Sequence, residues 1–284
     1  MELPSSLKGF PAREAWGGVA SLEPVSGGCI NHALRLETLS GPICLLKINR
    51  DAPRDMFARE AEGLRALRVP GGPRLPCVYA CEEQWILLEY LAPGGKDPGF
   101  GERLGEQLAR LHATSGPAFG FDHDNYLGVT PQPNRWSSDG YEFFAELRLR
   151  HQARLALQRG LLSPEESQSV DRIADRLPQL VPTQPPSLLH GDLWGGNVIV
   201  GPEGEPVLID PAVHYGWAEA ELAMTSLFRG FPPVFYLAYE ATRTVAPDYR
   251  ERFPLYNLYH LLNHLNLFGF AYHSQVSSIL RRYL

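Results

Sequence analysis

The pattern of apolar and polar residues changes near Tyr90. Before it, short apolar runs bounded by glycine, proline or serine predict strands at 32–37, 43–48 and 86–91. After it, apolar residues with helical spacing recur over 101–180 and 218–284. The pattern therefore predicts an α+β protein in which a small β-rich part precedes a larger, mostly helical part.

A segment rich in proline and glycine separates the two patterns. Residues 91–100 read Leu-Ala-Pro-Gly-Gly-Lys-Asp-Pro-Gly-Phe, a composition typical of a hinge. We therefore predict a bilobal protein, with an N-lobe of residues 1–91 and a C-lobe of residues 92–284.

One helix is expected within the N-lobe, over 55–67. Its apolar stripe contains Phe57, Leu64 and Leu67, and Glu60 falls within that stripe. A carboxylate on a buried helix face needs a cation, because an unpaired buried charge is strongly destabilising. The alternative is that Glu60 lies at the edge of the stripe, in solvent.

Lys47 is the expected partner of Glu60. It lies inside the apolar run 43–48 and is one of few lysines in a chain that mostly uses arginine for positive charge. A strand lysine paired with a helix glutamate is the arrangement that holds nucleotide phosphates in kinase-like folds. A lysine that merely extends to solvent at the end of a strand is the alternative.

The densest group of polar residues is the stretch His190-Gly191-Asp192-Leu193-Trp194-Gly195-Gly196-Asn197. A strand at 187–189 leads into it, and a hairpin over 197–209 should return the chain so that Asn197 and Asp210 lie at the same end. Two oxygen ligands at the mouth of a hairpin suit Mg²⁺. Asp192 is then free to accept the proton of an acceptor hydroxyl, and His190 is expected to anchor the loop.

Two further segments are predicted to contact a nucleotide. Gly27 and Gly28 lie in a turn between strand-like runs, where backbone amides can approach phosphate oxygens, although most such turns are ordinary hairpin connections. Glu89, Tyr90 and Leu91 end an apolar strand just before the hinge, where backbone groups can bond an adenine edge.

Composition narrows the choice of partner. The formal net charge is −6, and lysine and arginine form no block, which argues against nucleic acid or an anionic membrane as the main partner. The chain has four cysteines, too few for a disulfide scaffold. Because the first residues lack the apolar centre of a signal peptide and no apolar run is long enough to span a bilayer, we expect a cytoplasmic protein.

These motifs resemble those of the fructosamine kinase (ketosamine 3-kinase) family, which has the protein-kinase-like fold. The resemblance runs nearly end to end. Its marks are Gly27-Gly28-Cys29-Ile30-Asn31, the loop at 190–197, Asp210-Pro211-Ala212 and Tyr215-Gly216, Phe228-x-Gly230-Phe231-Pro232, and Asn263-His264-x-Asn266-x-Phe268-Gly269. His214 departs from the pattern, since a second aromatic residue or a serine-phenylalanine pair is expected before Tyr215.

The resemblance implies phosphorylation of the 3-hydroxyl of a ketosamine by ATP with Mg²⁺, after which the unstable product releases its amine, a deglycation. It implies Asp192 as proton acceptor, Asn197 and Asp210 as metal ligands, and Lys47 with Glu60 as the pair that positions phosphate. The ketosamine can be a small molecule or part of a protein, and the enzyme is expected to be a monomer or weak homodimer.

The acceptor site is less defined by the sequence. Trp194, Trp217 and His264 are the candidate substrate contacts. The tryptophan rings can stack on the apolar face of a sugar, and His264 is a polar residue in an apolar helix, where it needs a partner. The alternative for Trp194 is a buried anchor of its loop, and the alternative for Trp217 is core or surface packing. For His264 the alternative is a hydrogen bond between helices. Two other functions stay open: a phosphotransferase for an aminoglycoside or choline, and a non-catalytic nucleotide-binding regulator.

Overall fold

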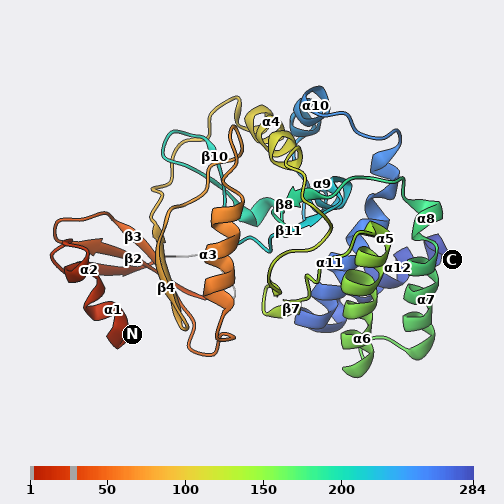
Figure 1. Ribbon diagram of the computed structural model, residues 1–284, viewed down its shortest axis with the longest axis horizontal. Helices are drawn as coiled ribbons and strands as arrows, with labels where there is room; N and C mark the ends of the chain where they lie inside the picture. Colours follow the sequence, from red (N-terminus) through yellow and green to blue (C-terminus); the bar gives the residue numbers. More distant parts are fainter. Residues whose placement is uncertain (1–2, 26–30) are drawn as a thin grey trace.

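The computed structural model describes residues 3–25 and 31–284. The chain forms a β-sheet part and a larger helical part, which lie side by side in Figure 1. The predicted α+β, bilobal architecture is confirmed. Gly27 and Gly28, predicted to contact phosphate, lie outside the described residues.

The sheet of the first part has five strands in the order β1-β2-β3-β5-β4. Every neighbouring pair is antiparallel. The strands predicted at 32–37, 43–48 and 86–91 are all present, displaced by at most two residues. The strands are β1 (Val19–Pro24), β2 (His32–Thr38), β3 (Cys44–Ile48), β4 (Val78–Glu82) and β5 (Trp85–Glu89).

The central strands are apolar on both faces, because each face is covered. In β3, Cys44, Leu46 and Ile48 point into a small core, which also takes Trp85 and Leu87 from β5. Two four-residue helices, α1 (Ser5–Lys8) and α2 (Phe10–Arg13), belong to the segment covering this face. They add to the single helix predicted for the N-lobe.

The predicted N-lobe helix is α3 (Met56–Ala66), and it covers the other face of the sheet. Phe57, Leu64 and Leu67 are fully buried, so the predicted apolar stripe is correct. Ile86 and Leu88 of β5 belong to the same core. Side chains alternate between the two faces of β3, so those that do not point into the small core face α3.

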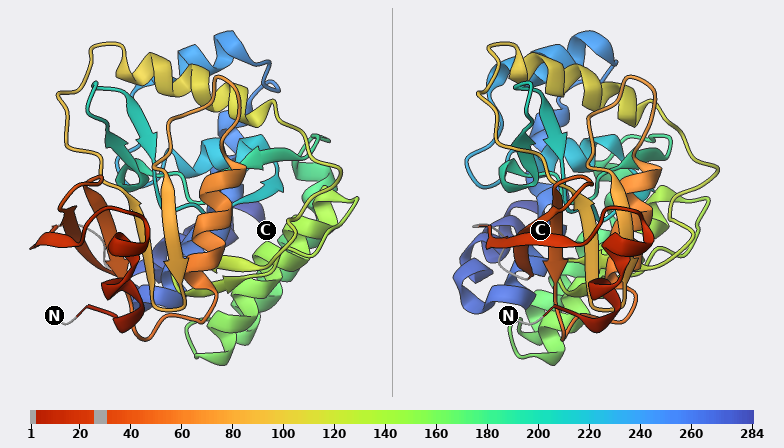
Figure 2. Two further views of the ribbon diagram at one scale, coloured as in Figure 1. Left: turned by 60° about the vertical axis from the view of Figure 1, so that its left-hand side comes forward. Right: turned by 90° about the vertical axis from the view of Figure 1, so that its left-hand side faces the viewer.

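The helical part follows from Phe100 onward. The views in Figures 1 and 2 agree that α4 and α10 lie side by side along one edge of the molecule. The first helix of the predicted helical region is α4, and its buried residues include Leu104, Leu108 and Leu111. The helical segments are α4 (Phe100–His112), α5 (Gly140–Phe144), the π-helical η1 (Ala145–Arg150), α6 (His151–Gln158), α7 (Pro164–Asp175), α8 (Leu177–Leu180), α9 (Ala218–Met224), α10 (Pro233–Thr242), η3 (Tyr249–Arg252), α11 (Phe253–Phe268), η4 (Gly269–Tyr272) and α12 (His273–Tyr283).

Short strand pairs within this part hold the polar loops. The strand predicted at 187–189 is β8 (Ser187–Leu189), which pairs with β11 (His214–Gly216). The predicted hairpin is β9 (Val198–Val200) with β10 (Pro206–Leu208), preceded by the turn η2 (Gly195–Asn197). The sequence did not predict β11 or the pair β6 (Asn125–Leu127) and β7 (Thr130–Gln132).

Arg74 joins the two parts of the molecule. Its guanidinium donates to Glu89 at the end of β5, at 2.9 Å, and also bonds Glu205 of the β9–β10 hairpin. Its carbonyl oxygen accepts from the Leu208 amide at 2.9 Å. Within the described residues, no helix is long and apolar enough to cross a membrane.

Candidate active site

Lys47 lies at the centre of the candidate site. Its neighbours Leu46 and Ile48 point into the small core, so its own side chain points towards α3. Lys47 Nζ lies 2.7 Å from Glu60 Oε1 and also contacts Asp210 Oδ1. The predicted Lys47–Glu60 pair is therefore present, and Asp210 joins it from the helical part.

The charge of Lys47 is maintained by its two acidic neighbours. Lys47 is only 7% exposed, and burial alone disfavours an ammonium ion. That effect is outweighed by the carboxylates of Asp210 and Glu60, and the net result raises the pKa of Lys47. The lysine is therefore a fixed cation at neutral pH, ready to bind the phosphate oxygens of a nucleotide.

The segment that carries Asp210 is held against α3. Gly63 permits this approach, because a Cβ there would lie 3.1 Å from Pro211 and 3.2 Å from Val213. On the other side, Gln132 Nε2 donates to the Ala212 carbonyl at 3.0 Å. Asp210 itself has a left-handed backbone, with φ of 57°, which asparagine and aspartate tolerate better than most residues. The position of its carboxylate is thus fixed by the backbone as well as by Lys47.

His190 anchors the polar loop that follows β8. It is fully buried, its Nε2 bonds the Ile209 carbonyl at 2.9 Å, and its Nδ1 accepts from the Asp192 amide at 3.3 Å. Burial lowers the pKa of His190, so the ring is neutral with its proton on Nε2. Gly191 has φ of 85°, and a Cβ there would lie 2.0 Å from the Ala212 carbonyl oxygen.

Asp192 is bonded by Asn197 and has a raised pKa. Asn197 Nδ2 donates to the Asp192 carbonyl oxygen at 2.8 Å and to its Oδ2 at 3.1 Å. Burial raises the pKa of Asp192 to about 7, helped by the charges of Asp210 and Glu221 and opposed by the Asn197 hydrogen bond. A carboxylate with a pKa near neutrality is suited to act as a general base at physiological pH.

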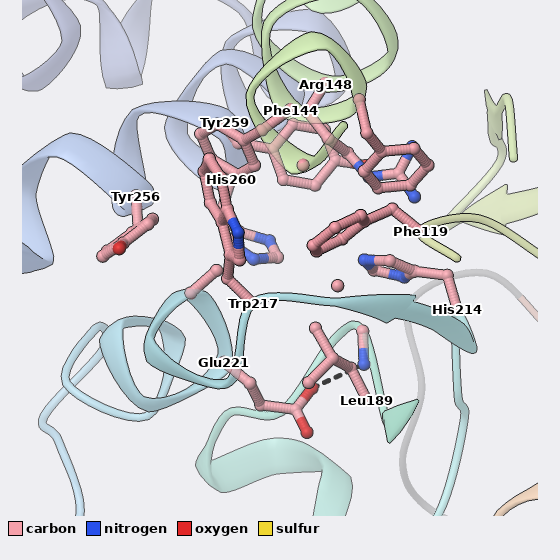
Figure 3. A pocket seen from close by; sticks show the side chains of 15 residues that line it. Phe119, Phe144, Arg148, Leu189, His214, Trp217, Glu221, Tyr256, Tyr259 and His260 are labelled. Atoms are coloured by element: carbon pink, nitrogen blue, oxygen red, sulfur yellow. Dashed lines mark hydrogen bonds between the residues drawn. The ribbon is translucent and has the colours of Figure 1, made fainter. Parts of the chain in front are cut away.

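Glu221 holds the backbone of this loop through hydrogen bonds. It was not predicted as a site residue. Its carboxylate accepts from the amides of His190 and Gly191, at 2.9 and 2.6 Å, and bonds His112 Nε2 at 2.9 Å. It is 3% exposed and lines the cavity of Figure 3. The sequence offered one signal, an acid within the otherwise apolar run 220–224. Glu221 is a positioning residue, because it acts through the backbone that carries Asp192.

We expect Glu221→Gln to lower the free energy of unfolding by about 1–3 kcal/mol at pH 7, because one buried amide then faces an NH₂ group instead of an oxygen. The bonds of Glu221 outweigh its burial and lower its pKa below the usual 4.5. Its contribution is therefore present above pH 4.5 and is lost as the pH falls through the lowered value. Urea denaturation at pH 7 and at pH 4 should show a smaller wild-type advantage at pH 4.

Glu142→Gln is the matched control, since Glu142 lies at an exposed position in the first turn of α5. It should change the free energy of unfolding by less than about 0.5 kcal/mol. Equal stability of Glu221→Gln and wild type at pH 7 would contradict the anchoring role of Glu221.

Asn197 and Asp210 can hold a hard metal ion. The Asn197 amide nitrogen is used by Asp192, which leaves the Asn197 Oδ1 lone pairs for another partner. The Asp210 side chain is 44% exposed, and Lys47 bonds its Oδ1. The backbones of the two residues are tied together, since the Ile209 amide donates to the Asn197 carbonyl at 3.1 Å. Carboxylate and amide oxygens are the ligands Mg²⁺ uses beside phosphate and water.

The hinge residues differ in which of their polar groups are already hydrogen-bonded within the protein. The Glu89 amide donates to the Cys77 carbonyl at 2.8 Å, and the Tyr90 amide donates to the Ile43 carbonyl at 3.3 Å. The Glu89 side chain is also engaged, with Arg74. Contact with an adenine edge is thus limited to the carbonyls of this segment and to Leu91. That contact remains a prediction.

Trp217 lies in the core and not on a surface beside Asp192. It is 4% exposed and packs against Phe119, Phe144 and Tyr256. The cavity that it lines in Figure 3 has a volume of about 20 Å³, enough for roughly one water molecule. A sugar cannot enter so small a space, so the structure does not support the prediction that Trp217 binds substrate.

The other two predicted substrate contacts lie close together. The ring of Phe228 is 5.8 Å from that of Trp194 and 4.8 Å from that of His264, measured between centroids. Trp194 and His264 are both half-buried, which leaves part of each ring accessible. Phe228, which the sequence marks only as part of a family-like motif and not as a substrate contact, therefore joins the two into one surface next to the loop of Asp192.

Solved structures show which class of protein has this fold. The aminoglycoside phosphotransferase APH(2'')-Ib aligns over 98% of this chain and 97% of its own, with a TM-score of 0.65 at 15% identity. The chain therefore has the protein-kinase-like fold of small-molecule phosphotransferases. The "putative fructosamine-3-kinase" of Thermobifida fusca YX-ER1 is more similar, with a TM-score of 0.89, 34% identity and 98% of each chain covered.

Sequence comparison identifies the family. The fructosamine kinase family model matches residues 14–284. The "Probable ketoamine kinase slr1563" of Synechocystis is 41% identical over 92% of this chain and 89% of its own. The chloroplastic protein-ribulosamine 3-kinase of Arabidopsis thaliana is 38% identical over 94% of this chain and 83% of its own. The chain belongs to the fructosamine kinase family, as the resemblance of its motifs indicates.

Proposed function

We propose that this protein transfers the γ-phosphoryl group of ATP to the 3-hydroxyl of ketosamines. Membership of the fructosamine kinase family supports the ketosamine substrate, and relatives carry the names ketoamine kinase and ribulosamine 3-kinase. The observation that carries the chemistry is the contact of Lys47 with Glu60 of α3 and with Asp210, which is remote in the sequence, beside the loop of Asp192.

Each of these residues has a separate role in the proposed reaction. Lys47, oriented by Glu60, binds phosphate oxygens of ATP. Asp192 orients the acceptor hydroxyl and takes its proton as the hydroxyl oxygen forms a bond to the γ-phosphorus and the bond from that phosphorus to ADP breaks. The neutral His190 and the carboxylate of Glu221 keep the Asp192 backbone in place.

Asn197 and Asp210 would hold Mg²⁺. When bound, the ion supplies charge neutralisation for the phosphates. Few protein ligands suffice, because Mg²⁺ keeps water and phosphate oxygens in its coordination shell. Among the described residues there is no cluster of three or more His, Cys, Asp or Glu that could bind a metal ion alone.

An aminoglycoside phosphotransferase is the alternative that the fold alone allows. The solved enzymes of that kind share only 14–17% identity with this chain, so they support the fold and not the substrate. The ketosamine proposal draws on relatives of about 40% identity that match nearly the whole chain.

A substrate panel tests the proposal. We expect ATP turnover with ribulosamines and fructosamines, and a kcat/KM for them at least about 100-fold above that for aminoglycosides and choline, because a polar acceptor site discriminates strongly against molecules that leave its groups unpaired. ADP release can be followed with each acceptor, and ATP without acceptor gives the background. Turnover confined to aminoglycosides or choline would refute the ketosamine assignment.

The panel should include each ketosamine on a small amine and on a protein lysine, since either form fits the proposal. The released phosphoketosamine would lose its amine by elimination, so the biological role would be deglycation. We further propose a cytoplasmic location and a monomer or weak homodimer.

A further inference from the structure

Four aromatic rings meet beside the loop of Asp192, and we refer to Trp194, Phe228, His264 and Tyr272 as the aromatic corner. The Phe228 ring is nearly perpendicular to that of Trp194, at 78°, and to that of Tyr272, at 88°, with centroids 5.8 and 6.4 Å away. The His264 ring lies at 39° to Phe228, 4.8 Å away. All four residues are half-buried, so each presents part of its surface to solvent.

The backbone that presents Phe228 is strained. Phe228 and Arg229 both have left-handed φ values, 50° and 83°, and Gly230 follows with 60°. Two consecutive non-glycine residues in this region are energetically costly and persist only where the surroundings enforce them. Strain of this kind is concentrated at binding and catalytic sites, so the turn requires an explanation beyond packing.

The surroundings of this turn do enforce it. The Gly230 amide donates to the Leu227 carbonyl at 3.1 Å, and the Phe231 amide donates to the Thr225 carbonyl at 3.0 Å. Asn257, buried in α11, donates to the Ser226 hydroxyl at 3.2 Å and to the Ala223 carbonyl at 2.9 Å. Phe228 is therefore held in position before any ligand binds.

The aromatic corner suits a cation. A cation over the face of an aromatic ring is attracted by the negative charge of that face, and clusters of aromatic rings bind substituted ammonium ions in this way. His264 does not oppose a positive charge, because its Nδ1 bonds the His260 carbonyl at 2.9 Å and burial lowers its pKa, leaving the ring neutral. Arg229 is exposed, so its charge is screened by water.

We propose that the aromatic corner binds the protonated secondary amine of the ketosamine, with Phe228 as the central ring. This inference rests on the proposed function. In a ketosamine, three carbon atoms separate the amine nitrogen from the 3-hydroxyl oxygen. Trp194 lies two positions after Asp192, so a hydroxyl held at Asp192 leaves the amine within reach of this surface. The corner thereby selects an aminated sugar over the parent ketose.

Phe228→Leu tests the proposal, because leucine keeps an apolar side chain and a similar backbone preference but lacks the negative ring face. The two acceptors are a ribulosamine and the matching ether, in which oxygen replaces the amine nitrogen. We expect the variant to raise KM for the ribulosamine about 5- to 30-fold, with little change in kcat, and to leave KM for the ether nearly unchanged. A purely structural role for Phe228 would change both KM values equally, and that result would overturn the proposal.

Phe231→Leu is the matched control, since Phe231 ends the same turn but packs on Phe235, with centroids 4.9 Å apart, outside the aromatic corner. Phe231→Leu should change the KM for the ribulosamine and the KM for the ether by the same factor. If Phe228→Leu is not recovered as a folded protein, Tyr272→Leu makes the same comparison from η4. A wild-type enzyme inactive on every ketosamine would refute the proposed function itself, whereas an active wild type with unchanged discrimination in Phe228→Leu and in Tyr272→Leu would refute only the cation site.

Discussion

Replacing Asp192 by asparagine should lower kcat by about 10²- to 10⁴-fold, the contribution typical of a general base, and leave ATP affinity little changed. The substitution keeps the size of the side chain but removes the group that accepts the hydroxyl proton. The 2.8 Å bond from Asn197 to the carbonyl oxygen of residue 192 does not involve the side chain, so the loop should keep its shape. Steady-state turnover and nucleotide titration together measure the two quantities.

Asp122→Asn serves as the control, because Asp122 is an exposed acid in a loop of the same part of the molecule. Its kcat should match that of the wild type. Asp192→Asn with near-normal turnover would remove Asp192 from the role of base. A parallel loss of ATP affinity would instead indicate that the substitution disturbs the nucleotide site.

Asp210→Asn should remove most of the gain in ATP affinity that Mg²⁺ provides and lower turnover by two to three orders of magnitude, since a bound ion contributes several kcal/mol to phosphoryl transfer. Asparagine is the informative replacement, because it tolerates the left-handed backbone of residue 210, with φ of 57°. Lys47 keeps its partner Glu60 at 2.7 Å, so its contact with phosphate should survive. ATP titrations with Mg²⁺ and with EDTA measure the difference.

The titration in EDTA is an internal control, because without the ion the variant and the wild type should bind ATP with similar affinity. A variant that retains the full response to Mg²⁺ would show that Asp210 does not hold the metal. A variant that binds ATP poorly in EDTA as well would show instead that Asp210 acts mainly through Lys47.

Much of the nucleotide side of the site could be predicted from the sequence, because periodic patterns carry the required information. The alternation along 43–48 and the stripe of α3 fix the faces on which Lys47 and Glu60 lie. A Lys–Glu pair can then be inferred before any coordinates are known. The hairpin over 197–209 likewise brings Asn197 and Asp210 together by local geometry.

The positions of the candidate acceptor residues could not be predicted in the same way, because these residues lie where no period applies. Trp217 immediately precedes α9, and the direction of its ring depends on Phe119 and Tyr256, which are distant in the sequence. Phe228 owes its position to a left-handed backbone that non-glycine residues seldom adopt and no local pattern announces.

Acids in the first turn of a helix are also misleading. Glu219 and Glu221 resemble ordinary charges that favour the N-terminus of α9. Both are buried, and their partners come from remote elements: Arg252 bonds both oxygens of Glu219 at 2.8 Å, and His112 bonds Glu221. Only the tertiary structure shows that one stabilises the helical part and the other supports the loop of Asp192.

The small core on the outer face of the sheet includes residues that precede the segment matched by the family model. The family match begins at residue 14, yet Leu7 is fully buried in that core and the Ser6 hydroxyl accepts a hydrogen bond from Trp85 Nε1 at 3.0 Å. In a chain trimmed to the matched segment, the face of β3 opposite Lys47 would be exposed to solvent. The position of β3, and with it that of Lys47, thus depends in part on a short amino-terminal segment that lies outside the matched residues.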